Sequence, residues 1–155
     1  MKLHYYQPSE DSSNFGDELN KYIWEYYFPN FFDEDDQVVF FGIGTILRAA
    51  KKFYPASKII IFGSGAHAPS QKMEPNFEVD FVRGPLSTQC LGLTKDHWIT
   101  DPAIVIPDVF PNNSVKKEFR YSYMPHYSVA NSTLEKLFKS LGIHYIDPRE
   151  DVFSI

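Results

Sequence analysis

The segment Val82-Arg83-Gly84-Pro85-Leu86-Ser87 places a cation, a glycine and a proline directly behind a strand-like run. Pro85 suits the first position of a helix, and Gly84 leaves the backbone before it open. Amides at a helix start favour an anion, and the guanidinium of Arg83 offers a planar fork that matches carboxylate or phosphate. The segment therefore predicts an anion site. An ordinary strand-to-helix turn with a surface arginine is the alternative.

A second group of polar residues, Asn14-Phe15-Gly16-Asp17, opens a predicted helix. Gly16 would let a ligand approach the backbone, and Asn14 and Asp17 could bond sugar hydroxyls. The same residue types are favoured as helix caps, and acids suit the positive end of the helix dipole. We predict a binding role for Asn14 and Gly16 and a catalytic role for Asp17, with simple capping as the alternative.

Two glycine loops follow strand-like runs. The segment Gly63-Ser64-Gly65-Ala66-His67-Ala68 matches the dinucleotide fingerprint G-x-G-x-x-A, but Pro69 and Pro75 argue against the helix that the fingerprint requires. The loop Gly42-Ile43-Gly44 lacks the third small residue. We predict instead that the backbones of both loops line a cleft. The candidate binding residues in these loops are Gly44, Gly63, Ser64 and Gly65, and Gly84 joins them from the loop beside Arg83.

His126 follows a strand-like run and is the second candidate catalytic residue, because an imidazole at the end of a strand can act as acid or base. A structural role in a turn is the alternative, and His67 carries the same ambiguity. The acids at 33–36 are contiguous, so their side chains diverge, and no metal site is predicted there.

The hydrophobic pattern alternates between strand-like and helical segments. Residues Leu19, Tyr22, Ile23, Tyr26 and Tyr27 follow the spacing of one helix face. The predicted strands are 3–6, 37–41, 58–62, 78–82, 119–124 and 143–146, and the predicted helices are 17–27, 45–53, 85–91 and 131–141. This alternation predicts an α/β fold with a Rossmann-like parallel sheet.

Prolines and asparagines between 107 and 113 mark a linker, so we divide the chain into a domain at 1–112 and a tail at 113–155. The tail contains one β-α-β unit, with Asn131 or Ser132 as the helix cap and Glu135 placed for a capping box. Such a unit is too small to form a core alone. We therefore predict self-association through the tail, and better behaviour of a chain that ends near 112.

Composition narrows the function classes. The 155 residues include 15 Lys+Arg and 20 Asp+Glu, a net charge of −5 without a basic tract, which argues against a nucleic-acid partner. Cys90 is the single cysteine and fits a reducing compartment. We predict no signal peptide, no membrane span and a cytoplasmic location.

Taken together, several segments resemble the polysaccharide pyruvyl transferase family, most closely its members from bacterial exopolysaccharide clusters such as that for succinoglycan. The resembling segments are 14–19, 41–47, 61–65, Val82-Arg83-Gly84-Pro85-Leu86-Ser87, Asp101-Pro102-Ala103 and Met124-Pro125-His126-Tyr127. The resemblance implies a GT-B-like fold of two Rossmann-like halves, of which this chain holds the first half and an incomplete second domain.

The resemblance also implies transfer of a pyruvyl group from phosphoenolpyruvate to two sugar hydroxyls as a ketal, with Arg83 on the donor and no metal or redox cofactor. The acceptor would be a lipid-linked or free oligosaccharide. The family is longer and carries a later motif of the Leu-His-Gly type, so we expect this chain to be a fragment or a truncated, inactive relative. The alternatives are a GT-B-like glycosyltransferase that uses a nucleotide sugar and a non-catalytic binding module.

Overall fold

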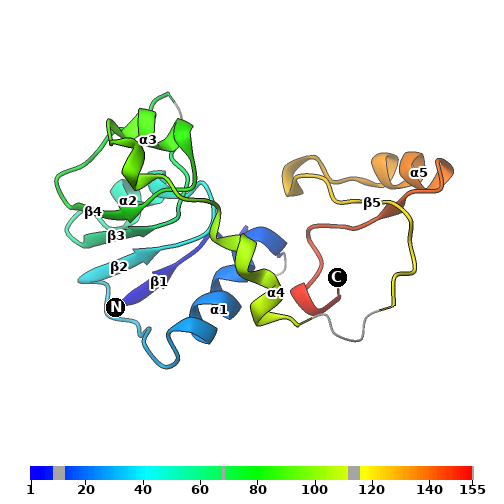
Figure 1. Cartoon of the computed structure of the whole chain (residues 1–155), viewed down its shortest axis with the longest axis horizontal. Helices are drawn as coiled ribbons and strands as arrows, with labels where there is room; N and C mark the ends of the chain where they lie inside the picture. The colour runs from blue at the N-terminus through cyan, green and yellow to red at the C-terminus, as the bar shows by residue number, and fades with distance from the viewer. Residues whose placement is uncertain (9–12, 68, 112–115, 155) are drawn as a thin grey trace.

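The computed structural model describes residues 1–8, 13–67, 69–111 and 116–154. Figure 1 shows a larger lobe built around a sheet, and a smaller lobe formed by the later part of the chain. The predicted domain boundary at 112 and Ala68 of the second glycine loop lie outside the described residues.

The larger lobe contains a parallel sheet of four strands in the order β1-β2-β3-β4, so the predicted parallel α/β architecture is confirmed. Lys2 lies opposite Val39, Val39 opposite Ile59, and Ile59 opposite Phe77. Because all four strands are parallel, their carboxyl ends share one edge. The strands are β1 (Lys2–His4), β2 (Val38–Phe41), β3 (Lys58–Phe62) and β4 (Phe77–Phe81).

Helices cover both faces of the sheet. Successive strand residues point to opposite faces, and because the strands carry apolar side chains on both, each face is buried under a helix. One face carries α1 (Phe15–Tyr27), and the other carries α2 (Leu47–Phe53) and α3 (Pro85–Leu91). The α1 face buries Leu19, Ile23, Trp24 and Phe40, whereas the α2 and α3 face buries Val39, Phe41, Leu47, Ile59, Ile61 and Leu91.

The connections after β1 and β2 diverge, because α1 and α2 lie on opposite faces of the sheet. The connection from β1 to β2 and the connection from β2 to β3 each lead to the next strand on the same side. Because one passes over one face of the sheet and the other over the opposite face, one crossover is right-handed and the other left-handed. Right-handed crossovers are nearly universal, which makes this pair unusual. Open α/β sheets bind ligands at the carboxyl ends of strands where neighbouring connections diverge. The fold therefore indicates a ligand site at the carboxyl ends of β1 and β2.

The segment after Asp101 is helical, and its second helix extends into the predicted linker. A 3₁₀ helix, Pro102–Val105, leads into α4 (Ile106–Val109), and both pack against α1. Pro107 lies in the first turn of α4, where proline is tolerated because the missing amide has no helical partner. The prediction that Pro107 breaks the chain is wrong, and any linker begins after Phe110.

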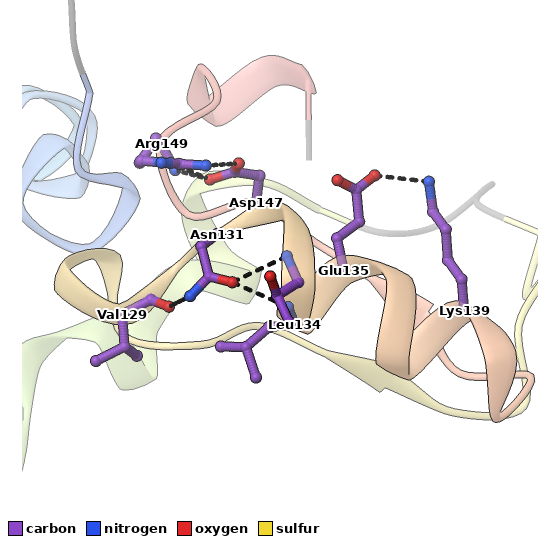
Figure 2. Close-up of polar contacts among 8 residues, drawn as sticks. Val129, Asn131, Leu134, Glu135, Lys139, Asp147 and Arg149 are labelled. Carbon is purple, nitrogen blue, oxygen red and sulfur yellow. Dashed lines mark hydrogen bonds and ion pairs between the residues drawn. The ribbon is translucent and has the colours of Figure 1, made fainter.

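The smaller lobe is the predicted β-α-β unit. Its strands β5 (Ser122–Tyr123) and β6 (His144–Tyr145) are parallel and flank α5 (Ser132–Ser140) in the sequence. Asn131 caps α5, because its Oδ1 accepts from the amides of Thr133 and Leu134 at 3.0 Å each (Figure 2). The predicted capping box does not form. Glu135 instead bonds Lys139 Nζ at 2.7 Å.

The last described residues return to the first lobe. Val152 is buried in the cluster that contains Leu19 and Ile23. The ring of Phe153 lies 5.0 Å from that of Tyr22, and the Pro148 carbonyl accepts from the Phe15 amide at 2.9 Å. The tail therefore packs against α1 and bonds the amide at its first residue. In the described part of the chain, no helix has the length and apolar character needed to cross a membrane.

We expect that removing residues 113–155 reduces self-association but also lowers the stability of the remaining chain. The shortened chain should associate less, because the exposed Leu137 and Leu141 of α5 are gone. It should also melt at a lower temperature, because Val152 and the bond to the Phe15 amide are lost. Light scattering and thermal melting of both chains measure these effects. A shortened chain that associates more than the full one would show that the tail belongs to a single domain.

Candidate functional site

The carboxyl edge of the sheet brings the predicted loops together through backbone hydrogen bonds. The Gly65 amide donates to the Gly44 carbonyl at 2.8 Å, and the Arg83 amide donates to the Ser64 carbonyl at 3.2 Å. The Gly63 amide bonds the Phe81 carbonyl at 2.8 Å. The loops after β2, β3 and β4 therefore form one continuous surface, as expected for the ends of parallel strands.

Arg83 reaches back from the end of β4 across this surface. Its Nη2 donates to Thr45 Oγ1 at 2.6 Å, and its Nη1 lies 3.7 Å from Asp101 Oδ2. The guanidinium lies against Gly65, where a Cβ would come within 2.5 Å of Nη2. The side chain of Arg83 remains 38% exposed, so N–H groups stay available to an anion.

The start of α3 contributes less to this site than its sequence predicts. Gly84 is extended and unobstructed, and Pro85 begins the helix as expected. The helix has only seven residues, and the Ser87 amide is bonded to the Gly84 carbonyl at 3.1 Å. The side chain of Arg83 is therefore the group here best placed to bind an anion.

Asp17 lies in the first turn of α1 with its carboxyl group turned toward Gly44. Its Oδ2 accepts from Asn14 Nδ2 at 2.5 Å. Its Oδ1 is buried and has no hydrogen-bond partner within the described residues. A Cβ on Gly44 would lie 2.4 Å from this oxygen, so the glycine, which has a φ of +111°, provides the space for it. Gly16, one residue before, has open space around its α-carbon.

The surroundings of Asp17 favour the protonated form of its carboxyl group. Burial raises the pKa of the carboxyl from 3.8 to about 7, and the positive charge of Arg83 opposes this rise without cancelling it. A carboxyl group with a pKa near 7 can both donate and accept a proton at neutral pH. Arg83 and Asp17 are therefore electrostatically coupled at one edge of the sheet.

The alternative role of the Asn14 segment as a helix cap is confirmed only in part. Asn14 occupies the N-cap position of α1, but its side chain makes no capping bond to a helix amide and bonds Asp17 instead. The amide of Phe15 is bonded by Pro148 from the tail. The side chains of Asn14 and Asp17 thus form a polar pair at the site.

Asn20 supports the site and was missed by the sequence analysis. It is fully buried, and its Oδ1 accepts from Trp24 Nε1 and from the Ile43 amide, at 2.8 Å each. Its Nδ2 donates to the carbonyls of Asp17 and Ile43 at 2.9 and 3.1 Å. The side chain therefore ties α1 to the loop after β2. An amide between Leu19 and Ile23, on an apolar helix face, was the available signal.

Ser64 braces its loop from inside. Its hydroxyl is fully buried and donates to the Gly42 carbonyl at 2.6 Å, so in this conformation it does not face the open side of the loop. Gly63, with a φ of +96°, packs beneath Pro102, where a Cβ would come within 2.1 Å of Cγ. Gly63 and Ser64 thus shape the loop, whereas Gly65 faces Arg83.

His126 is exposed and begins a 3₁₀ turn, Tyr127–Val129. Its Nδ1 lies 2.8 Å from Ser128 Oγ, and the structure shows no contact with Asp17 or Arg83 among the described residues. Its neighbour Tyr127 instead reaches the end of β1, where its hydroxyl lies 3.4 Å from that of Tyr6. His67 is exposed on the loop after β3. Of these two neighbours, Tyr127 and not His126 bonds the first lobe within the described residues, and the charge of Asp17 reaches Tyr127.

The described residues contain no cluster of three or more His, Cys, Asp or Glu side chains that could hold a metal ion. Of the acids at 33–36, Asp33 pairs with the N-terminal amine at 2.8 Å and Glu34 with Lys2 at 2.6 Å. The acidic segment is thus paired with the start of β1, at the amino ends of the strands and away from the carboxyl ends that form the site.

The chain is similar to the succinoglycan biosynthesis protein ExoV of Rhizobium meliloti (strain 1021). The two are 30% identical over 153 residues, which cover 96% of this chain and 48% of ExoV. The chain therefore spans about half the length of this relative. No family model matches the chain. No solved structure matches it either.

Proposed function

We propose that this chain carries the donor side of an enzyme that transfers a pyruvyl group from phosphoenolpyruvate to two saccharide hydroxyls, forming a ketal in exopolysaccharide biosynthesis. The observation that carries the proposal is the placement of Arg83 beside Asp17, a carboxyl group with a pKa of about 7. The similarity to a succinoglycan biosynthesis protein supports the polysaccharide context.

The donor needs a local positive site, because phosphoenolpyruvate carries several negative charges and the chain has a net charge of −5. Arg83 supplies a fork that can bind a carboxylate or phosphate through two parallel bonds. Thr45 holds one end of the guanidinium, and Gly65 lets it lie flat against the loop. These contacts fix the direction of the fork before the donor arrives.

The chemistry needs a proton at the methylene carbon of the donor. Protonated Asp17 gives its proton to this carbon, and the carbon that bears the phosphate becomes an oxocarbenium-like centre. The first sugar hydroxyl attacks that centre and returns its proton to the Asp17 carboxylate. Inorganic phosphate then leaves, and the second hydroxyl closes the ketal and gives its proton to phosphate. Asp17 thus ends the cycle protonated.

We place the reaction in the cytoplasm. Cys90 is the single cysteine, and its Sγ donates to the Gln71 carbonyl at 3.0 Å. A partly buried free thiol fits a reducing compartment.

Thermal melting with candidate donors tests the proposal. Phosphoenolpyruvate should raise the melting temperature, because a ligand that binds the native state stabilises it. A rise with UDP-glucose and none with phosphoenolpyruvate would select a glycosyltransferase. A folded chain that responds to neither would indicate a binding module without this chemistry.

Replacing Arg83 by lysine should weaken phosphoenolpyruvate binding. Lysine keeps the charge but loses the fork, and the loss of one charge-assisted bond costs about 1.5–3 kcal/mol. Calorimetry should therefore show a dissociation constant that is about 10- to 150-fold larger. Arg120→Lys is the matched control, because Arg120 lies in the smaller lobe against Tyr121. Unchanged affinity in Arg83→Lys would remove Arg83 from the donor site.

A further inference from the structure

We propose that Tyr6 and Tyr127 form a platform that binds the pyranose ring of the acceptor beside Asp17. This inference rests on the proposed function, and it assigns the acceptor side of the same site. The platform joins the two lobes, because Tyr6 follows β1 and Tyr127 begins the turn Tyr127–Val129.

The two tyrosines form a contact that leaves aromatic surface available. Their ring centroids lie 5.8 Å apart at an interplanar angle of 48°, and their hydroxyls are 3.4 Å apart. Tyr6 is 40% exposed although it contacts Tyr127. An aromatic ring offers an apolar face to the C–H groups of a sugar, and the phenol hydroxyl can bond the sugar hydroxyls.

The strand order places this platform on the acceptor side of Asp17. Tyr6 follows the edge strand β1, and Asp17 lies against Gly44 after β2. The guanidinium of Arg83 lies further along the edge, against Gly65 after β3. Asp17 therefore stands between the anion-binding cation and the two rings, where a proton donor must lie if it serves both substrates.

The electrostatics agree with this order. The hydrogen bond that Tyr127 donates to Tyr6 raises the pKa of Tyr127, and the negative charge of Asp17 raises it further. The carboxyl of Asp17 thus lies within electrostatic reach of both Tyr127 and Arg83. Because the pKa of Tyr127 is raised, its phenol stays neutral around pH 7 and can donate a hydrogen bond to a sugar.

The tail holds the platform in place. The Pro148 carbonyl accepts from the Phe15 amide at 2.9 Å, at the start of the helix that carries Asp17. Val152 packs into the cluster around Leu19. These contacts fasten the smaller lobe to α1, so Tyr127 and Asp17 are positioned together.

Saturation-transfer NMR with methyl β-D-glucopyranoside and methyl β-D-galactopyranoside tests the platform. We expect transfer to the ring protons of at least one glycoside, and affinity that is about three- to tenfold weaker in Tyr6→Ala and Tyr127→Ala. Tyr127→Phe keeps the ring and should lose less. Tyr26→Ala is the control, because Tyr26 is 55% exposed and pairs with Tyr27 at 5.1 Å, at the far end of α1.

Three outcomes would overturn the platform: no transfer to either glycoside in the unsubstituted chain, the same loss in Tyr26→Ala, or weakened binding of UMP rather than of the glycosides. If an alanine variant unfolds, the binding site is mapped instead by NMR of the unsubstituted chain with ¹³C-labelled tyrosine rings. The glycoside should then shift the signals of Tyr6 and Tyr127 but not the signal of Tyr26.

Calorimetry with phosphoenolpyruvate is run separately. Loss of donor binding contradicts the proposed function, whereas loss of glycoside binding alone contradicts only the platform.

Discussion

Replacing Asp17 by asparagine should reduce ketal formation by a factor of about 10²–10⁴, the usual contribution of a general acid or base. Asparagine can still accept the bond from Asn14 that Oδ2 now accepts at 2.5 Å, so the local structure should persist. It cannot deliver a proton. We also expect the activity of the unsubstituted enzyme to fall as the pH rises above about 7, because Asp17 then loses its proton.

The same substitution should stabilise the folded chain at high pH. Burial raises the pKa of Asp17 from 3.8 to about 7, so between these values the native state holds a proton that the unfolded state has lost. The free energy of unfolding therefore decreases as the pH rises through this range. Each pKa unit corresponds to about 1.4 kcal/mol. We expect Asp17→Asn to be more stable than the original chain by about 1–3 kcal/mol at pH 8, and similar to it near pH 4.

Urea unfolding at pH 4 and pH 8 measures this effect, together with ketal formation in an active preparation that contains the chain. Asp108→Asn is the control, because Asp108 is exposed and bonds Tyr27 at 2.9 Å, away from the site. Activity should survive in the control. If Asp17→Asn instead loses activity and stability together at pH 8, Asp17 has a structural role and the proposed proton transfer is wrong.

The sheet could be predicted from the sequence because its signals are local. The run 58–62 is apolar on both faces, which is typical of a parallel strand covered by helices. The stops at Gly92 and Gly142 are also local, since both adopt the left-handed conformation, with φ of 67° and 71°. The predicted boundaries of α3 are met at both ends.

The helical segment 102–109 could not be predicted in the same way. Its prolines give the signal of a chain break, and only packing on α1 shows that they lie in first turns. The coupling between Arg83 and Asp17 also depends on long-range geometry. It requires the loop register that joins Gly44 to Gly65, and no sequence spacing encodes that register.

The contact between Tyr127 and Tyr6 shows the same limit. The sequence places His126 and Tyr127 in one turn after a strand, and histidine has the more familiar acid–base chemistry. Which of the two residues faces the first lobe depends on how the tail returns to α1 through Pro148 and Val152. The sequence therefore located the turn without identifying the residue that contacts Tyr6.

Replacing Asn20 by alanine should destabilise the chain by about 2–5 kcal/mol, the range in which broken buried networks fall. The change leaves the amide of Ile43 and the indole N–H of Trp24 buried without the acceptor that now binds each at 2.8 Å. It also releases the loop that holds Gly44 against Asp17, so donor binding should weaken at the same time.

Urea unfolding and calorimetry with phosphoenolpyruvate measure the two losses in Asn20→Ala. Asn76→Ala is the control, since Asn76 is half-buried and its side chain makes a single bond, donated to the Ser57 carbonyl at 2.7 Å. It should cost about 1 kcal/mol and leave donor binding unchanged. If Asn20→Ala loses stability but binds the donor normally, the loop after β2 keeps its place without Asn20. The position of Asp17 would then depend on the tail contact at Phe15 rather than on the amide between α1 and β2.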